Sequence, residues 1–155
     1  MNTYRSSFFL LATAVIFSSC TKQQPAADPE VMMAKLAKEA VAEAKEKYST
    51  VLDFQFASVQ RVDSILGVLH NTHSDEPLPE NEINRQSYLW GAYVGEVIKL
   101  KRPFHWERDS EMGKETFPLV SEKNEKLFPT AWCYKRIING NEDNVWFKTR
   151  ISLSD

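Results

Sequence analysis

The feature that most constrains this chain is an apolar stretch near its middle, Tyr88–Ile98, whose only other residues are two glycines and a glutamate. Its eleven residues are too few to cross a bilayer as a helix, so the stretch predicts the buried helix of a globular core. We expect that helix to extend from Pro79 or Glu80 to Lys101, because Pro103 cannot continue it.

Gly91 and Gly95 lie four residues apart, and therefore on one face of this helix. Without side chains there, another backbone can approach closely, or a ring such as Trp106 can lie flat against the helix. We interpret the pair as a packing device rather than a membrane dimerisation motif, because the segment is too short to span a bilayer.

Two further helices are predicted upstream. Glu30–Tyr48 is rich in helix formers, with Asp28 as its N-cap and Pro29 as its first residue. Its apolar stripe is mostly alanine, so we expect it to be loosely docked or to stand clear as a stalk. Val51–Phe56 predicts a short strand or an extended lead-in, and Ser58–His70 predicts an amphipathic helix whose first residue is its N-cap.

The pattern changes to β in the last third of the chain. Phe104–Glu107 alternates and Phe117–Val120 is a short apolar run, while Thr130–Ile138 and Val145–Leu153 predict two strands joined as an antiparallel hairpin. Helices followed by strands predict an α+β fold, with two to three helices packed on one face of a small antiparallel sheet. We expect an alanine-rich helix over 30–50 and a single α+β domain over 51–155.

Residues 1–19 resemble a bacterial lipoprotein signal peptide. Arg5 precedes an apolar run, Phe8–Phe17, and two serines lead from it to Cys20. The resemblance implies that Cys20 is lipidated and becomes the mature N-terminus, although Phe17 stands where the pattern prefers Leu, Val or Ile. An ordinary secretory signal, or an N-terminal anchor with an incidental cysteine, is the alternative.

Lipidation would anchor the protein in the bilayer through two or more acyl chains, with residues 20–29 as a flexible tether. By analogy with other lipoproteins, Thr21 after the cysteine favours the outer membrane, and the lack of an acidic stretch favours its periplasmic face. Cys133 would then be the only thiol left in an oxidising compartment.

The charge balance excludes one large class of function. The chain has 19 Lys and Arg against 21 Asp and Glu, a net charge of −2, whereas nucleic-acid binders carry a basic excess. We therefore predict no nucleic-acid partner. The sequence contains no Gly-x-Ser-x-Gly elbow, glycine-rich phosphate loop or His-Glu-x-x-His motif, so it predicts no catalytic residue, no cofactor and no metal.

Glu96 is the candidate functional carboxylate, because it lies in the most apolar stretch of the chain. A buried carboxylate must be paired, hydrogen-bonded or protonated. The structural interpretation is an ion pair with Arg136 or Arg150, or a hydrogen bond from a tryptophan N–H. The functional interpretation is ligand binding or, together with His105, catalysis.

The candidate binding face is Trp146, Lys148 and Arg150. In the predicted last strand, Val145 and Phe147 face inward, which leaves the tryptophan outward between the two cations. Such a face suits a peptide, a sugar or a protein partner. Core packing of the tryptophan is the alternative.

Two weaker constellations have a simpler interpretation. His70 and His73, followed by two acidic residues, have a spacing that suits a metal, but they lie at a predicted helix end before the polar loop 71–81. A solvated loop is the favoured interpretation. Cys133 lies between two aromatic residues of a predicted strand, which favours a buried and unreactive thiol.

Several short motifs resemble those of a family of small uncharacterised bacterial domains. They are the Gly-Ala-Tyr-x-Gly-Glu helix within Trp90–Ile98, the downstream Trp106, and Lys135-Arg136-Ile137 followed by Asn139-Gly140. The lead-in Leu52–Val59 is similar as well, so the resemblance spans about residues 52 to 147. It supports the α+β fold and, because the family has no established activity, it implies no chemistry.

The sequence thus predicts a membrane-anchored, periplasm-facing lipoprotein that acts as a non-catalytic binding or interaction module, for example an immunity-type protein that neutralises a toxin. The rival hypothesis is an envelope hydrolase that uses Glu96 and His105. A third is a structural envelope component whose alanine-rich helix is a spacer. The expected partners are the lipid bilayer, through acylated Cys20, and a protein in the periplasm.

Overall fold

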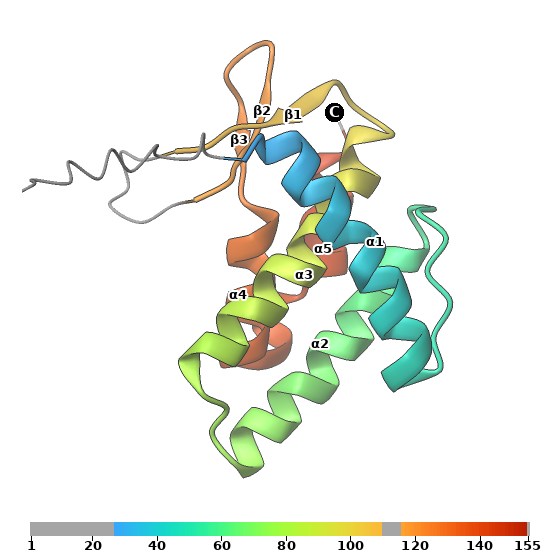
Figure 1. The fold of residues 1–155 in the computed structure, drawn as a ribbon, viewed down its shortest axis with the longest axis vertical. Coiled ribbons are helices and arrows are strands. Elements are labelled where there is room, and N and C mark those ends of the chain that lie inside the picture. The colour runs from blue at the N-terminus through green and yellow to red at the C-terminus, as the bar shows by residue number, and fades with distance from the viewer. Residues whose placement is uncertain (1–26, 110–115, 155) are drawn as a thin grey trace, which may run out of the picture.

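The computed structural model describes residues 27–109 and 116–154, which form an α+β fold (Figure 1). Helices dominate it, and the strands are short. In chain order the elements are α1 (Pro29–Tyr48), α2 (Ser58–Asp75), α3 (Glu80–Lys99), β1 (Phe104–Trp106), β2 (Leu119–Ser121), β3 (Lys126–Leu127), α4 (Pro129–Asn139), the 3-10 helix η1 (Gly140–Asp143) and α5 (Val145–Ser152).

Helix α1 begins as predicted. The Asp28 carboxylate accepts a hydrogen bond from the Glu30 N–H at 2.9 Å, and Pro29 is the first helical residue. Its alanine stripe is not loosely docked, however, because Ala37, Ala40 and Ala44 are all at most 1% exposed. Their small side chains let α1 lie close against α3, so the helix is part of the core and the stalk interpretation is wrong.

Helix α3 is the centre of the core, as its apolar stretch predicts, and Trp90 and Tyr93 on it are fully buried. Its two glycines permit two close contacts. A Cβ at Gly91 would lie 2.5 Å from Cα of Thr130 in α4, and one at Gly95 would lie 2.0 Å from the indole ring of Trp106. The backbone approach and the flat-lying ring that the glycine spacing predicts are both confirmed.

The sheet lies at the end of the molecule where α1 begins (Figure 1). Its three described strands are antiparallel in the order β1-β2-β3, with Phe104 opposite Ser121 and Trp106 opposite Leu119. In β1, Phe104 and Trp106 are buried and His105 is exposed, as the period of two requires. The α+β class is therefore confirmed, and the strand predicted at Phe104–Glu107 is present.

The predicted C-terminal hairpin is wrong, because both of its strands are helices, α4 and α5. Pro129 occupies the first turn of α4, a position that suits proline. At the start of α5 the Asn144 side chain accepts from the Phe147 N–H at 2.8 Å, and the Asp63 carboxylate of α2 accepts from the Val145 N–H at 2.7 Å. These caps satisfy N–H groups that would otherwise be left unpaired.

Two upstream features also differ from the prediction, the conformation of Val51–Phe56 and the end of α2. Val51–Phe56 contains no strand and runs as an irregular segment. Helix α2 continues to Asp75, so both histidines are helical and the polar loop is shorter than expected. Ser58 is its first residue and not its N-cap, because its hydroxyl donates to the Gln55 carbonyl.

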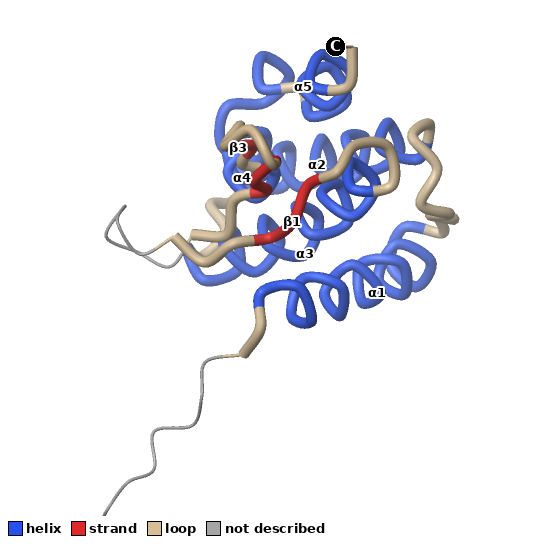
Figure 2. Tube along the Cα trace, turned by 90° about the horizontal axis from the view of Figure 1, so that it is seen from above, coloured by secondary structure: helices blue, strands red, loops and turns tan. Residues whose placement is uncertain are grey.

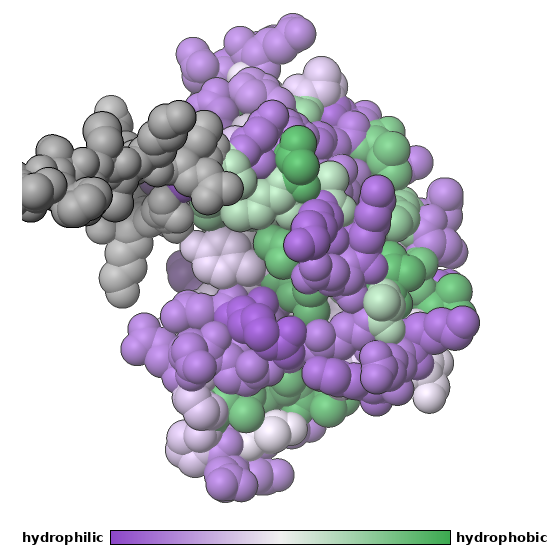
Figure 3. Space-filling model, viewed as in Figure 1, coloured by the Kyte–Doolittle hydropathy of each residue, from purple (hydrophilic) through white to green (hydrophobic). Residues whose placement is uncertain are grey.

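Helices α1 and α5 lie on opposite sides of the molecule, with α3 and α4 between them (Figure 2). The face that carries α1 and α3 is mostly hydrophilic, with smaller hydrophobic areas among the polar residues (Figure 3). None of the helices in the described ranges combines the length and the apolar character that a membrane span requires.

Candidate functional site

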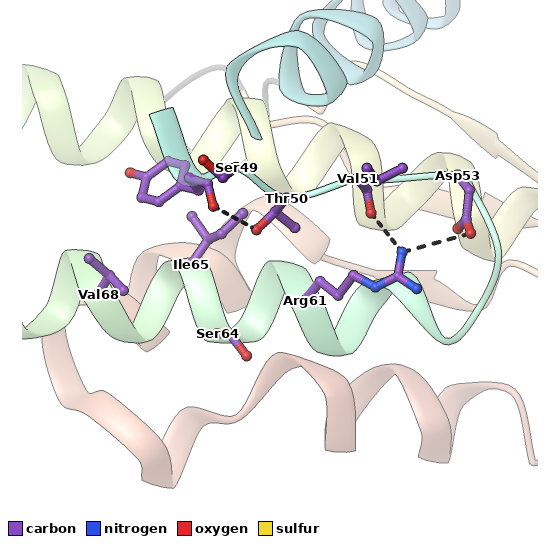
Figure 4. A pocket seen from close by; sticks show the side chains of 9 residues that line it. Ser49, Thr50, Val51, Asp53, Arg61, Ser64, Ile65 and Val68 are labelled. Atoms are coloured by element: carbon purple, nitrogen blue, oxygen red, sulfur yellow. Dashed lines mark hydrogen bonds and ion pairs between the residues drawn. The ribbon is translucent and has the colours of Figure 1, made fainter. Parts of the chain in front are cut away.

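A groove of about 670 Å³ opens between residues 48–53, from the last residue of α1 onward, and one side of α2 (Figure 4). Val51 from the first wall and Ile65 and Val68 from α2 provide its apolar lining, and hydroxyls line it as well. Figure 4 shows Ile65 pointing from α2 into the groove, whereas Ser64 points to the other side of the helix.

The apolar part of the groove is exposed to solvent. Val51 is 67% exposed and Val68 is 52% exposed, while Ile65 between the walls is only 3% exposed. The two valines are among six large apolar side chains that are exposed in the described part of the chain, so a third of them line this one groove. Covering such side chains is favourable by about 25 cal/mol per Å² of apolar surface.

The first wall of the groove is fixed by the core. Phe54 has a left-handed backbone, with φ of 56°, which is costly for a residue with a Cβ. The Tyr93 hydroxyl accepts from the Phe54 N–H at 2.8 Å and lies 2.6 Å from the Ser58 hydroxyl, and the Phe54 and Tyr93 rings are 4.8 Å apart. Because Tyr93 is buried in α3, the chain is held to the core directly after residues 48–53.

An ion pair stands at one end of the groove. Nη1 of Arg61 donates to the Val51 carbonyl at 2.6 Å and lies 3.7 Å from the Asp53 carboxylate. The Gln55 N–H, and to a smaller extent Arg61, hold the pKa of Asp53 below its usual range. Asp53 therefore stays ionised, and Arg61 is held across the end of the groove.

A second cavity, of about 510 Å³, adjoins the groove on the other side of α2. Ser64 and Val68 line both depressions, and Gly67, His70 and Arg136 line only the second. It lies where α2 meets α4 and η1. The two depressions are therefore neighbours on α2, one mostly apolar and the other mostly polar, and together we call them the recess.

A buried polar network forms the inner wall of the second cavity. The side chains of Asp63 and Arg136 are 10% and 8% exposed, and Nε of Arg136 donates to Oδ1 of Asp63 at 3.2 Å. The same carboxylate accepts from Nδ2 of Asn144 at 2.8 Å and from the Val145 N–H. Asp63 therefore joins α2 to α4 and to the start of α5, and all three of its donors come from the protein.

Glu96, the carboxylate singled out by sequence, serves packing. Its Oε1 accepts from Nε1 of Trp106 at 2.8 Å and from Nζ of Lys99 at 3.0 Å. Lys99 also pairs with Glu30, whose other oxygen accepts from the Trp106 N–H at 2.7 Å. The predicted tryptophan hydrogen bond is confirmed, but the cation is a lysine one turn away and not an arginine. The cluster ties the start of α1 to α3 and β1.

His105 and Glu96, the two residues that the hydrolase hypothesis combines, lie apart in the structure. His105 lies on the exposed face of β1, opposite the face on which Trp106 reaches Glu96. Its Nε2 lies 2.8 Å from the Glu107 carboxylate, with both side chains about half exposed. The structure therefore does not bring His105 and Glu96 together.

The predicted face of Trp146, Lys148 and Arg150 is not a sheet face, because these residues lie on α5. Trp146 is partly buried against Phe56, with ring centroids 4.3 Å apart, and Lys148 pairs with Asp143. Only Arg150 is exposed, and it lies over the ring of Phe147. The sequence predicts Phe147 facing inward and Trp146 facing outward on a strand. Because the segment is a helix with a period of 3.6, Phe147 is half exposed instead and Trp146 is partly buried.

The remaining candidates are held by backbone groups or by burial. Nδ1 of His70 bonds the Ile137 carbonyl at 2.9 Å, and Nδ1 of His73 accepts from the Leu78 N–H at 3.1 Å. Within residues 27–109 and 116–154, no three His, Cys, Asp or Glu side chains are grouped so as to hold a metal ion. Cys133 is fully buried, and burial raises the pKa of its thiol far above the usual range.

The signal peptide, Cys20 and most of the tether lie outside the described residues. No protein-family model, no curated protein and no solved structure matches the chain. The resemblance to a family of small bacterial domains therefore stays a prediction, and the structure supplies a packing role for three of its motif residues, Tyr93, Gly95 and Glu96.

Sequence reasoning missed the recess on α2. Arg136 and Gly67 carried a usable signal, because an arginine between apolar helical positions and a glycine inside a helix both need a structural reason. The groove had none, because Val51 and Val68 are ordinary apolar residues whose exposure depends on how α1 and α2 pack.

Proposed function

We propose that this protein is a lipid-anchored, non-catalytic binding module of the bacterial envelope, and that its ligand occupies the groove between residues 48–53 and α2. The observation that carries the proposal is that Val51 and Val68, which lie on the two facing walls of one groove, are both exposed. Exposed apolar groups gathered in a concave site are typical of a surface that a ligand covers.

Anchoring rests on the signal that precedes Cys20 and places the module at the periplasmic face of a membrane. Its test is metabolic labelling of the full chain with an alkyne analogue of palmitate, followed by membrane fractionation. Cys20→Ala should abolish labelling and release the protein from the membrane, whereas Cys133→Ala should change neither. Labelling that persists without Cys20 would contradict the anchor.

Binding in the groove is tested by a photoreactive benzoylphenylalanine placed at single positions of the full chain in its native cells. Val51 and Val31 make a matched pair, since they are 67% and 66% exposed and only Val51 lines the groove. We expect one discrete adduct from position 51 and none from position 31. Adding Val68→Asp should remove that adduct, because a carboxylate would be desolvated beneath the ligand.

Two outcomes would contradict binding in this groove. One is the same set of adducts from positions 31 and 51, which would indicate random collisions. The other is a position-51 adduct that survives Val68→Asp at undiminished yield in a variant that still folds.

A further inference from the structure

The second cavity contains an arginine whose hydrogen-bonding capacity is only partly used. The Arg136 side chain is 8% exposed, and its Nε donates to Asp63. Neither Nη1 nor Nη2 donates to any residue that the structure describes. Every fully buried side-chain nitrogen in the described ranges has a partner, so these two atoms are reached by solvent, and the cavity that Arg136 lines is where solvent reaches them.

The guanidinium lies against a glycine of α2. Gly67 lies inside α2, where glycine costs about 1 kcal/mol relative to alanine. A Cβ at this position would lie 2.9 Å from Nη2 of Arg136. Gly67 therefore leaves room for the buried side chain at a cost to helix stability.

The other polar groups of the cavity suit an anionic ligand. Asn71 and Asn141 line it with two amides, whereas the Ser64 hydroxyl in its lining donates to the Gln60 carbonyl. The amide oxygen of Asn141 accepts from Nδ2 of Asn144 at 3.4 Å, which leaves its NH₂ group to donate.

We propose that this cavity binds the C-terminal carboxylate of a peptide through Nη1 and Nη2 of Arg136, and that the apolar side chains at the end of the peptide lie in the adjoining groove. Two parallel N–H groups match the two oxygens of a carboxylate. The charge of Arg136 is balanced by Asp63, so the cavity suits a single negative charge better than a phosphate dianion.

The groove favours a peptide over a fatty acid. Its lining includes the Thr50 hydroxyl, and the Arg61–Asp53 pair stands at one end, which suits a polar backbone and not an acyl chain. Because Ser64 and Val68 line both depressions, a ligand passes from one to the other over the same turn of α2. This ligand class rests on the proposed function, since it extends the same site.

The test uses the full chain in detergent micelles with two dansyl-labelled tetrapeptides, Gly-Ser-Val-Leu as the free acid and as the C-terminal amide. Fluorescence anisotropy should show about tenfold to a hundredfold tighter binding of the acid, as expected for hydrogen bonds to a charged group. Arg136→Gln should remove the preference. Arg150→Gln should keep it, because Arg150 lies on α5 away from the cavity.

Gly67→Ala keeps the test decisive if Arg136→Gln fails to fold. It leaves the Asp63 carboxylate paired and displaces only the flexible end of Arg136, so it should weaken binding of the acid and leave the circular dichroism spectrum unchanged. Equal affinity for acid and amide would overturn the proposal, as would a full preference in Gly67→Ala. Decanoate and inorganic phosphate are also added as competitors. If either displaces the labelled peptide completely at a lower concentration than the unlabelled free-acid peptide does, the cavity is assigned to a fatty acid or a phosphate instead.

The two proposals fail separately. A groove adduct at position 51 without any preference for the free carboxylate would leave the proposed function standing and overturn the carboxylate site. Loss of the position-51 adduct, with the preference for the free acid intact, would overturn binding in the groove and leave the carboxylate site standing.

Discussion

Charged side chains play different parts at the two ends of this molecule. Where α1 begins, Lys99 has two carboxylate partners and Glu96 has two donors, so the cluster with Trp106 is mutually satisfied. In the recess, Arg136 of α4 keeps two nitrogens without a protein partner, and Val68 of α2, which lines the same cavity, stays exposed. A charge in an apolar context is thus a weak indicator of function until its hydrogen bonds are counted.

The strongest test of this difference compares two glycine-to-alanine changes. Gly95→Ala should destabilise the protein by about 3 kcal/mol or more, because its Cβ would meet the buried ring of Trp106. Gly67→Ala should be neutral or stabilising by about 1 kcal/mol, because only a flexible side-chain end must move. Urea denaturation of both variants measures the free energies of unfolding. Equal losses would remove the distinction between the two regions.

The α1–α3 side should also be the acid-sensitive one. Burial alone would raise the pKa of Glu43, but hydrogen bonds from Arg85, Gln86 and Lys47 outweigh it and lower the pKa to about 2. A lowered carboxylate pKa stabilises the fold above the unfolded value of 4.5, and the stabilisation is lost as the pH falls toward 2.

We expect that loss to be about 2 kcal/mol, because Arg85 is 45% exposed and solvent screens the pair. Unfolding free energies at pH 6 and pH 3 measure the larger part of it, about 1 kcal/mol, because pH 3 is still above the folded pKa of about 2. Glu43→Gln should reduce the difference between the two, while Glu39→Gln on the exposed side of α1 serves as the control. An identical pH dependence in all three proteins would refute the assignment.

Lys99→Met should have a smaller effect. It leaves Glu30 and Glu96 close together without their shared cation, which should cost about 1 kcal/mol after allowance for solvent screening. Thermal unfolding at low and high salt measures this loss, and salt should reduce it. Lys101→Met, on an exposed lysine, is the control and should change the midpoint little.

The smallest effect is expected at the groove. Val68→Ser should change the free energy of unfolding by less than about 0.5 kcal/mol, because the side chain is 52% exposed. Val62→Ser on the same helix is fully buried and should cost about 2 kcal/mol or more. A large loss in Val68→Ser would mean that this residue supports the fold, which would weaken its case as a binding residue.

The parts of the fold predictable from sequence are those decided by near neighbours. Asp28 and Pro29 mark the start of α1, and the spacing of Gly91 and Gly95 predicts two close contacts. The C-terminal segments were not predictable in this way. Val145, Phe147 and Thr149 alternate like a strand, and one of the two groups that cap α5 is a carboxylate on α2, 82 residues earlier in the chain.

The candidate site shows the same limit. Glu96 and Trp146 drew attention because of their local sequence, and both are held by packing partners. The recess on α2 is made by three separate parts of the chain, and the unused nitrogens of Arg136 follow only from the single bond it makes to Asp63. No local sequence pattern indicates which nitrogens of a buried arginine will be left without a partner in the protein.

Helix α1 has a consequence for orientation. The described chain enters the domain beside the sheet, and the groove begins at Tyr48, the last residue of α1. A helix of 20 residues is about 30 Å long, so the entry point and the groove are separated by the length of α1. Because Glu30 and Lys99 fix that helix to β1 and α3, it cannot swing. If the chain is anchored near its N-terminus as proposed, the recess therefore lies one helix length from the point of entry and is not covered by the attachment itself.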